Sequence, residues 1–109
     1  MTETARKYLA DILRAIDLVE EFTAGLKNFA DYENDLKTQS ATERQLAIIG
    51  EALNKLKKAE PELTIENDKQ IISFRNRLFH AYDSIDNTIV WTIIKRYLPA
   101  LKSEINRIN

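Results

Sequence analysis

The residues best suited to chemistry lie together in one short stretch, Arg75-Asn-Arg-Leu-Phe-His80-Ala-Tyr82-Asp83. His80 is the single histidine of the chain, and an unperturbed imidazole can take up or release a proton near neutral pH. On a helix, Asn76 and Arg77 precede His80 by about one turn and share nearly the same face. Arg75 is displaced around the helix by about 140°, but its long side chain can curve towards the histidine. A guanidinium beside an imidazole suits a phosphodiester, because arginine can hold the anionic oxygens while histidine moves a proton.

The same stretch also has a purely structural interpretation. Cations are favourable at the negative end of a helix dipole, so Arg77 and His80 can stabilise the terminal carbonyl groups of a helix. Tyr82 can be a packed aromatic ring with a solvated hydroxyl group. Helical geometry slightly favours Arg77 over Arg75 as the phosphate ligand. Spacing alone therefore leaves the catalytic and the structural interpretations open.

The composition indicates which elements carry these residues. The chain has 109 residues with two glycines and two prolines, whereas average usage of about 7% Gly and 5% Pro predicts about a dozen. Sandwiches, barrels and doubly wound sheets need many tight turns, which depend on these residue types. The composition therefore favours helices, and the length favours one domain over residues 1–109.

Charge and cysteine content narrow the classes of function. The chain lacks cysteine, which excludes disulfides and thiolate metal sites and suits a reducing cytoplasm. With one histidine as well, we expect no metal site and no cofactor. The formal net charge of -1 gives no overall positive field, so any nucleic-acid site must be local. Apolar runs reach four residues, far below the roughly 20 of a spanning helix, so no membrane segment is expected.

Apolar residues recur every three or four positions and predict an all-α fold, an antiparallel bundle of four or five helices. This spacing predicts a long helix over Thr4–Phe22 and a shorter one within Leu26–Leu36. Ser40-Ala-Thr-Glu43 matches a capping box, so a second long helix is expected to begin there. It should end at Lys57-Lys58, shortly before Pro61.

The second half of the chain predicts the remaining helices. Asn67-Asp68 can cap a third helix, which carries the histidine in its last turn. Asp83–Asn87 is typical of a break, and Asp86 can cap the next helix. That helix should hold Ile89–Tyr97, after which Pro99 can open a last segment that reaches the end of the chain.

Three further residues have more than one interpretation. Gly50 lies inside a predicted helix, where glycine costs about 1 kcal/mol relative to alanine, so close packing of another helix is the favoured reason. Glu51 can reach Arg75, but a solvated carboxylate is the favoured interpretation. Trp91 is expected to anchor the core or a dimer interface.

The histidine stretch resembles the motif of HepT toxins, which belong to the HEPN superfamily. It consists of Arg75, four residues, His80, one residue and Tyr82, with Asn76 directly after the arginine. The surrounding residues that share the resemblance are Ile48-Ile-Gly-Glu-Ala52, Asp86 and Val90-Trp91. The resemblance covers nearly the whole chain. It implies a HEPN-like helical bundle that works as a homodimer.

The resemblance also implies an activity, metal-independent endoribonuclease cleavage of RNA. Arg75, Asn76 and His80 would be its catalytic residues, and Arg75 and Arg77 would bind the RNA phosphate. His80 would act on the ribose 2′-OH or on the leaving 5′-oxygen, and Asn76 would orient the histidine or the phosphate. Two subunits would bring their motifs into one cleft and so double its positive charge.

Regulation is implied by the resemblance as well. In a type VII toxin–antitoxin system, a nucleotidyltransferase antitoxin of the MntA type attaches AMP to the motif tyrosine, here Tyr82. A phosphate beside Arg75 and His80 would pair with the charges that substrate phosphate needs. The implied partners are a second copy of the chain, this antitoxin and RNA.

Two alternatives belong to other classes of function. The first is a non-catalytic subunit whose cleft at Arg75 and His80 holds a nucleotide for a partner nucleotidyltransferase. The second is a dimeric adaptor bundle without a ligand, in which these two residues contribute to stability alone.

Overall fold

The computed structural model describes residues 1–80 and 85–108, with the side chains of Phe79 and His80 left out. Throughout this part of the chain the secondary structure is helical and no strand occurs. The elements are α1 (Glu3–Thr23), α2 (Phe29–Glu33), α3 (Leu36–Ala59), α4 (Lys69–His80), α5 (Asn87–Thr92), the π-helical η2 (Ile93–Tyr97) and α6 (Leu98–Ile108). The predicted helical bundle is confirmed.

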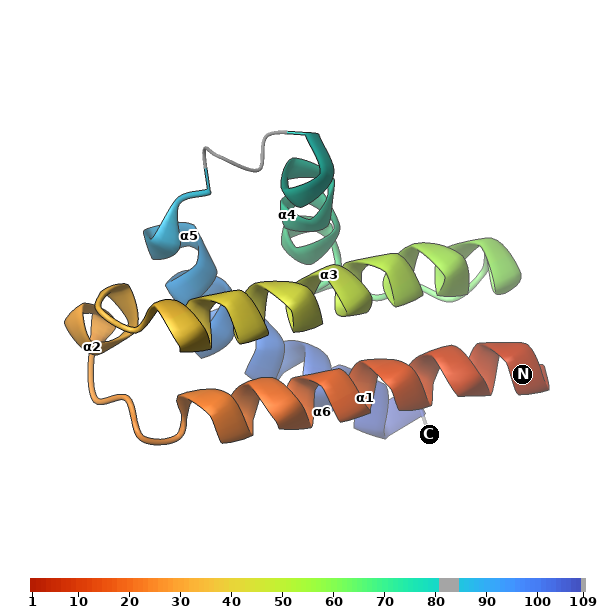
Figure 1. The fold of residues 1–109 in the computed structure, drawn as a ribbon. Helices are drawn as coiled ribbons and strands as arrows, with labels where there is room; N and C mark the ends of the chain where they lie inside the picture. Colours follow the sequence, from red (N-terminus) through yellow and green to blue (C-terminus); the bar gives the residue numbers. More distant parts are fainter. Residues whose placement is uncertain (81–84, 109) are drawn as a thin grey trace.

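Two long helices, α1 and α3, lie side by side and form the centre of the bundle (Figure 1). α6 packs against α1, and α4 packs on the side of α3 that faces away from α1 (Figure 1). Most of the apolar stripe predicted for α1 is buried, although Phe22 at its end is exposed. Thr2 caps the helix by accepting a hydrogen bond from the Ala5 amide at 3.1 Å. The predicted span of α1 is therefore correct to within a residue at either end.

The start of α3 differs from the prediction. The helix begins at Leu36, and its cap is Asp35, which accepts from the Thr38 amide at 3.0 Å and from the Thr38 hydroxyl at 2.6 Å. Ser40 therefore lies inside the helix and does not cap it. Leu36, which the apolar pattern assigned to the preceding short helix, is the first residue of α3 and is 75% exposed. The predicted end is confirmed, since Lys57 and Lys58 lie in the last turn.

The last three elements form one continuous helical run. Asp86 caps α5 as predicted, accepting from the Thr88 amide at 2.9 Å. The run continues past Tyr97 through a π-helical turn, in which the Leu98 amide donates to the Ile93 carbonyl. Pro99 follows this turn. Because proline lacks an amide hydrogen and its ring clashes with the carbonyl four residues earlier, a widened turn is the expected adjustment.

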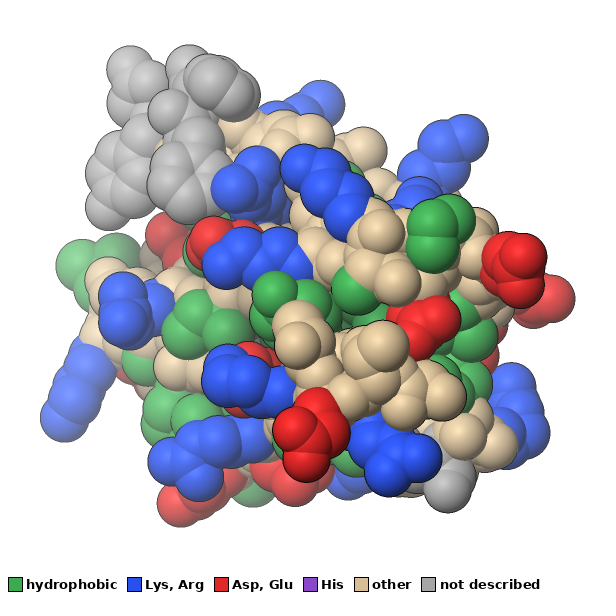
Figure 2. All heavy atoms as spheres, turned by 90° about the vertical axis from the view of Figure 1, so that its right-hand side faces the viewer, with side chains coloured by type: hydrophobic (Ala, Val, Ile, Leu, Met, Phe, Trp, Pro, Cys, Tyr) green, Lys and Arg blue, Asp and Glu red, His purple; other side chains and the backbone are tan. Residues whose placement is uncertain are grey.

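The surface carries charges of both signs. Figure 2 shows Lys and Arg side chains spread over one end of the bundle with Asp and Glu side chains between them. Among the described residues, no helix is both long and apolar enough to cross a membrane.

Candidate functional site

The contact between α3 and α4 is set by Gly50. A Cβ atom at position 50 would lie 2.5 Å from Cβ of Arg75, 3.0 Å from its Cγ and 3.2 Å from the Ile71 carbonyl oxygen. No side chain fits into that space, because real Cβ contacts are longer. The predicted reason for this glycine, close packing of another helix, is confirmed, and the residue it admits is the motif arginine.

Arg75 is consequently held at the interface between the two helices. Its side chain is half-buried, with Nε shielded from solvent, while Nη1 donates to Oδ1 of the exposed Asn76 at 3.1 Å. A guanidinium held by its stem and by a neighbouring amide loses less side-chain freedom when it binds an anion than a fully exposed one does. The structure thus brings Arg75 and Asn76 together.

The other predicted site residues lie further along α4 or beyond it. Arg77 is exposed and lies on another side of the helix from Arg75. His80 was predicted to lie in the last turn of this helix, and it is the last residue of α4. Tyr82 lies outside the described residues.

Two buried carboxylates, neither of them predicted as a contact, fix the start of α4. Asp68, directly before the helix, is buried and pairs with Lys57 of α3 at 3.1 Å. Glu104 of α6 is also buried, and it accepts hydrogen bonds from the Glu66 and Asn67 amides at 2.6 and 3.3 Å. The Asn67 side chain adds a third bond to Glu104 at 3.1 Å. These contacts tie the segment before α4 to α3 and α6.

A signal for Glu104 was present in the sequence. Its position lies on the same helical face as the apolar residues Leu101 and Ile108, which are three and four positions away. A carboxylate on an apolar stripe must find donors when it is buried. Here the donors come from the connection between α3 and α4.

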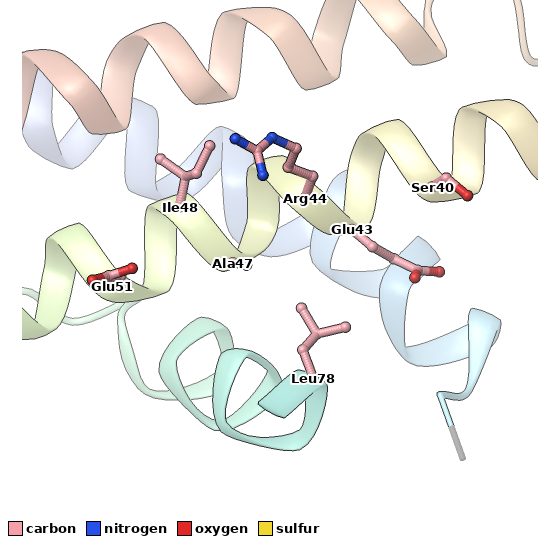
Figure 3. Close-up of a pocket in the computed structure, with 7 residues that line it drawn as sticks. All are labelled: Ser40, Glu43, Arg44, Ala47, Ile48, Glu51 and Leu78. Carbon is pink, nitrogen blue, oxygen red and sulfur yellow. The ribbon is translucent and has the colours of Figure 1, made fainter. Parts of the chain in front are cut away.

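A groove of about 490 Å³ lies between α3 and the last turns of α4. Figure 3 shows Leu78 projecting from α4 towards α3, between Glu43 and Glu51. Burial raises the pKa of the Glu43 carboxyl above its usual value. Glu51 is about half exposed and pairs with Lys55 at 3.4 Å, which agrees with the solvated interpretation. Two carboxylates and one arginine, Arg44, make this groove unfavourable for an anion.

Trp91 packs where α2 meets α5. Its ring lies 5.7 Å from that of the buried Tyr32 and 6.5 Å, edge to face, from that of Phe29. Lys95 Nζ lies 4.7 Å from the centre of the indole. The tryptophan therefore anchors the aromatic edge of the core, in agreement with the first of its two predicted roles.

Burial, with the negative charge of Glu43, raises the pKa of the Tyr32 hydroxyl.

Comparison with known proteins supports the predicted resemblance. The chain matches the family model described as "Ribonuclease HepT-like" over residues 12–108. It is 37% identical to "Probable ribonuclease HepT" of Thermococcus cleftensis, over 99% of this chain and 98% of that protein. It is 32% identical to "Putative RNase TTE0752" of Caldanaerobacter subterraneus subsp. tengcongensis, over 97% and 95% of the two chains. No solved structure matches the chain.

Proposed function

Because the chain belongs to the HepT-like ribonuclease family, we propose that it is an endoribonuclease whose Arg75 and His80 act on an RNA phosphodiester. The observation that carries the proposal is the placement of Arg75. Gly50 admits its side chain between α3 and α4, and Asn76 holds its guanidinium. A half-buried, oriented guanidinium five residues before the histidine that ends α4 is suited to a phosphate. The relatives named as ribonucleases support the same activity.

The proposed reaction uses the ribose 2′-OH as its nucleophile. The 2′-oxygen forms a bond to phosphorus, and the bond from phosphorus to the 5′-oxygen breaks. The proton of the 2′-OH passes to a general base, and the leaving 5′-oxygen receives a proton from a general acid. The products are a 2′,3′-cyclic phosphate and a 5′-OH. Arg75 stabilises the charge that develops on the phosphoryl oxygens.

One histidine cannot easily serve as base and acid in the same step, since each role needs the opposite protonation state. A homodimer would supply two copies of His80 and of Arg75, one set from each protomer. It would also raise the local positive charge on a chain whose net charge is -1. We therefore propose a homodimeric site.

The reaction predicts a strict requirement for the 2′-OH. An RNA with one 2′-deoxynucleotide on the 5′ side of the mapped cut should resist cleavage at that bond, whereas the unmodified RNA is cut. EDTA should leave the rate unchanged, since the proposed groups are side chains of the protein. Mass spectrometry of the products should show the cyclic phosphate. Cleavage at the 2′-deoxy position would contradict the mechanism.

We also propose that the activity is controlled at Tyr82, two residues beyond His80. In this scheme the protein is the cytoplasmic toxin of a type VII toxin–antitoxin system, and an MntA-type nucleotidyltransferase is its antitoxin. The antitoxin transfers AMP from ATP: the Tyr82 oxygen bonds to the α-phosphorus, the bond from that phosphorus to pyrophosphate breaks, and the hydroxyl proton is released. The product carries a phosphodiester anion close in sequence to the proposed phosphate ligands. That anion would compete with RNA for the same positive charges.

The modification is testable by intact-mass measurement. The chain expressed with an active nucleotidyltransferase partner should gain whole AMP units, and peptide mapping should place them at Tyr82. The modified protein should lose RNA cleavage. The Tyr82→Phe variant should gain no mass and should keep its cleavage activity when the partner is present. An unmodified chain in the presence of a bound, active partner would instead favour the nucleotide-binding subunit.

A further inference from the structure

α4 has a second groove on the side that faces α5. This groove has a volume of about 460 Å³ and is lined by Lys69, Gln70, Ser73, Phe74, Arg77 and Ile89. Its lining contains two cations and no carboxylate. The groove between α3 and α4 instead carries Glu43 and Glu51 against one arginine. Of the two grooves beside α4, the one towards α5 is the one suited to a polyanion.

The cations of this groove follow the axis of α4. Lys69, Ser73 and Arg77 are spaced by four residues, so they form a row on one face of the helix. The row is about 12 Å long, which is enough to meet more than one phosphate of a nucleic acid strand. All three side chains are exposed. The row runs from the first residue of α4 towards the end of the helix that carries Asn76 and His80.

A further hollow continues the groove along α5 and η2. It has a volume of about 190 Å³, shares Gln70 and Ile89 with the groove of the cations, and ends at Tyr97. The Tyr97 ring lies 5.6 Å from the guanidinium carbon of Arg96. A positive groove joined to an aromatic ring is the combination that binds single-stranded nucleic acid, since cations follow the backbone while bases stack.

We propose that this groove, the α4–α5 groove, binds a single strand of RNA and leads it to the cleavage site. Lys69 and Arg77 contact phosphates, Ser73 and Gln70 contribute hydrogen bonds, and a base stacks on Tyr97. The inference rests on the proposed ribonuclease function. It extends the predicted phosphate contact at Arg77 to a path along α4 from Lys69 to Arg77.

Asp86 lies near Arg77, at one end of the α4–α5 groove, and its negative charge opposes the binding of RNA there. Hydrogen bonds from Thr88 are the main cause of its lowered pKa, and the positive charge of Arg77 adds to the effect. Asp86 is therefore ionised at neutral pH and offsets part of the charge that RNA would meet. Asparagine caps helices as well as aspartate does. Asp86→Asn thus removes the charge and keeps the cap of α5.

The binding test uses the His80→Ala protein, so that RNA is not cut, with a fluorescently labelled single-stranded RNA and anisotropy at several salt concentrations. Lys69→Gln and Arg77→Gln should each weaken binding and reduce the slope of log K against log salt by about 0.7. Asp86→Asn should strengthen binding. Tyr97→Ala should weaken it by about tenfold or more, whereas Tyr97→Phe should not. Arg14→Gln is the charge-matched control, because Arg14 lies on α1, with α3 between it and α4 (Figure 1).

The outcomes separate this inference from the ribonuclease proposal. If the wild-type protein cuts RNA while the groove variants bind it with unchanged affinity and salt slope, the α4–α5 groove is not the path. Light scattering of the wild-type protein and the groove variants measures their oligomeric state. If Lys69→Gln or Tyr97→Ala turns a dimer into a monomer, the groove is covered by a second copy and the inference is overturned. If the groove variants weaken RNA binding but the wild-type protein never cleaves RNA, the groove stands and the ribonuclease proposal fails.

Discussion

Replacement of His80 by alanine is expected to slow RNA cleavage by about 100-fold to 10,000-fold, the usual contribution of a general acid or base. The structural interpretation of His80 predicts a different result. A cation at the end of α4 would stabilise the helix by about 0.3–1 kcal/mol, and its loss would lower the melting temperature without affecting the rate. Rate and melting temperature, measured on the same preparation, distinguish the two. A folded His80→Ala protein that cuts RNA at the normal rate would exclude the catalytic role.

The two arginines provide the matched comparison for this experiment. Arg75 is half-buried and oriented by Asn76, whereas Arg77 is exposed in the α4–α5 groove. Loss of an oriented group that stabilises transition-state charge should lower kcat, by about 100-fold to 1000-fold for Arg75→Ala. Loss of an exposed phosphate contact should mainly raise KM, which is the expected result for Arg77→Ala. An equal effect of both variants on kcat would mean that the burial of Arg75 has no catalytic significance.

Much of the fold could be predicted because α1 and the C-terminal run follow local rules. A regular apolar stripe and the break that follows it are enough to predict the bounds of α1. The start of α5 could be predicted because Asp86 is a typical N-cap residue. The start of α3 could not be decided in this way, because Asp35 with Thr38 and Ser40 with Glu43 both satisfy capping rules. The helix begins at the earlier signal, and Leu36, which the apolar pattern assigned to the preceding short helix, is its first residue.

The candidate site was less predictable, because its geometry depends on contacts between distant segments. Periodicity placed Arg75 and Asn76 on one helix, but the burial of Arg75 depends on Gly50, which lies 25 positions earlier. In the same way, the hydrogen bonds that Glu104 accepts from the Glu66 and Asn67 amides span 38 and 37 positions. The shape of the α4–α5 groove depends on the angle at which the two helices pack, and no local feature of the sequence indicates that angle.

Gly50→Ala is expected to lower both stability and activity. The new Cβ would lie 2.5 Å from Cβ of Arg75, and neither atom can move by rotation about a side-chain bond, so α4 itself must shift. Overpacking of this kind costs about 1–3 kcal/mol, while alanine recovers about 1 kcal/mol of helix propensity, so the expected net loss of stability is up to about 2 kcal/mol. Thermal unfolding followed by circular dichroism measures this loss. At a temperature where the variant is fully folded, kcat should still fall, because the guanidinium of Arg75 has moved.

Gly25→Ala is the control for this prediction. No atom lies within 4 Å of the Cβ that it would add, so the substitution should leave activity unchanged and should stabilise the fold by up to about 1 kcal/mol through the unfolded chain. The comparison separates the general effect of alanine from the effect of the contact. If Gly50→Ala behaved like Gly25→Ala, the close approach of α4 to α3 would not position Arg75. If Gly50→Ala lowers kcat in the folded protein, the absence of a side chain at position 50 is what positions the phosphate ligand Arg75.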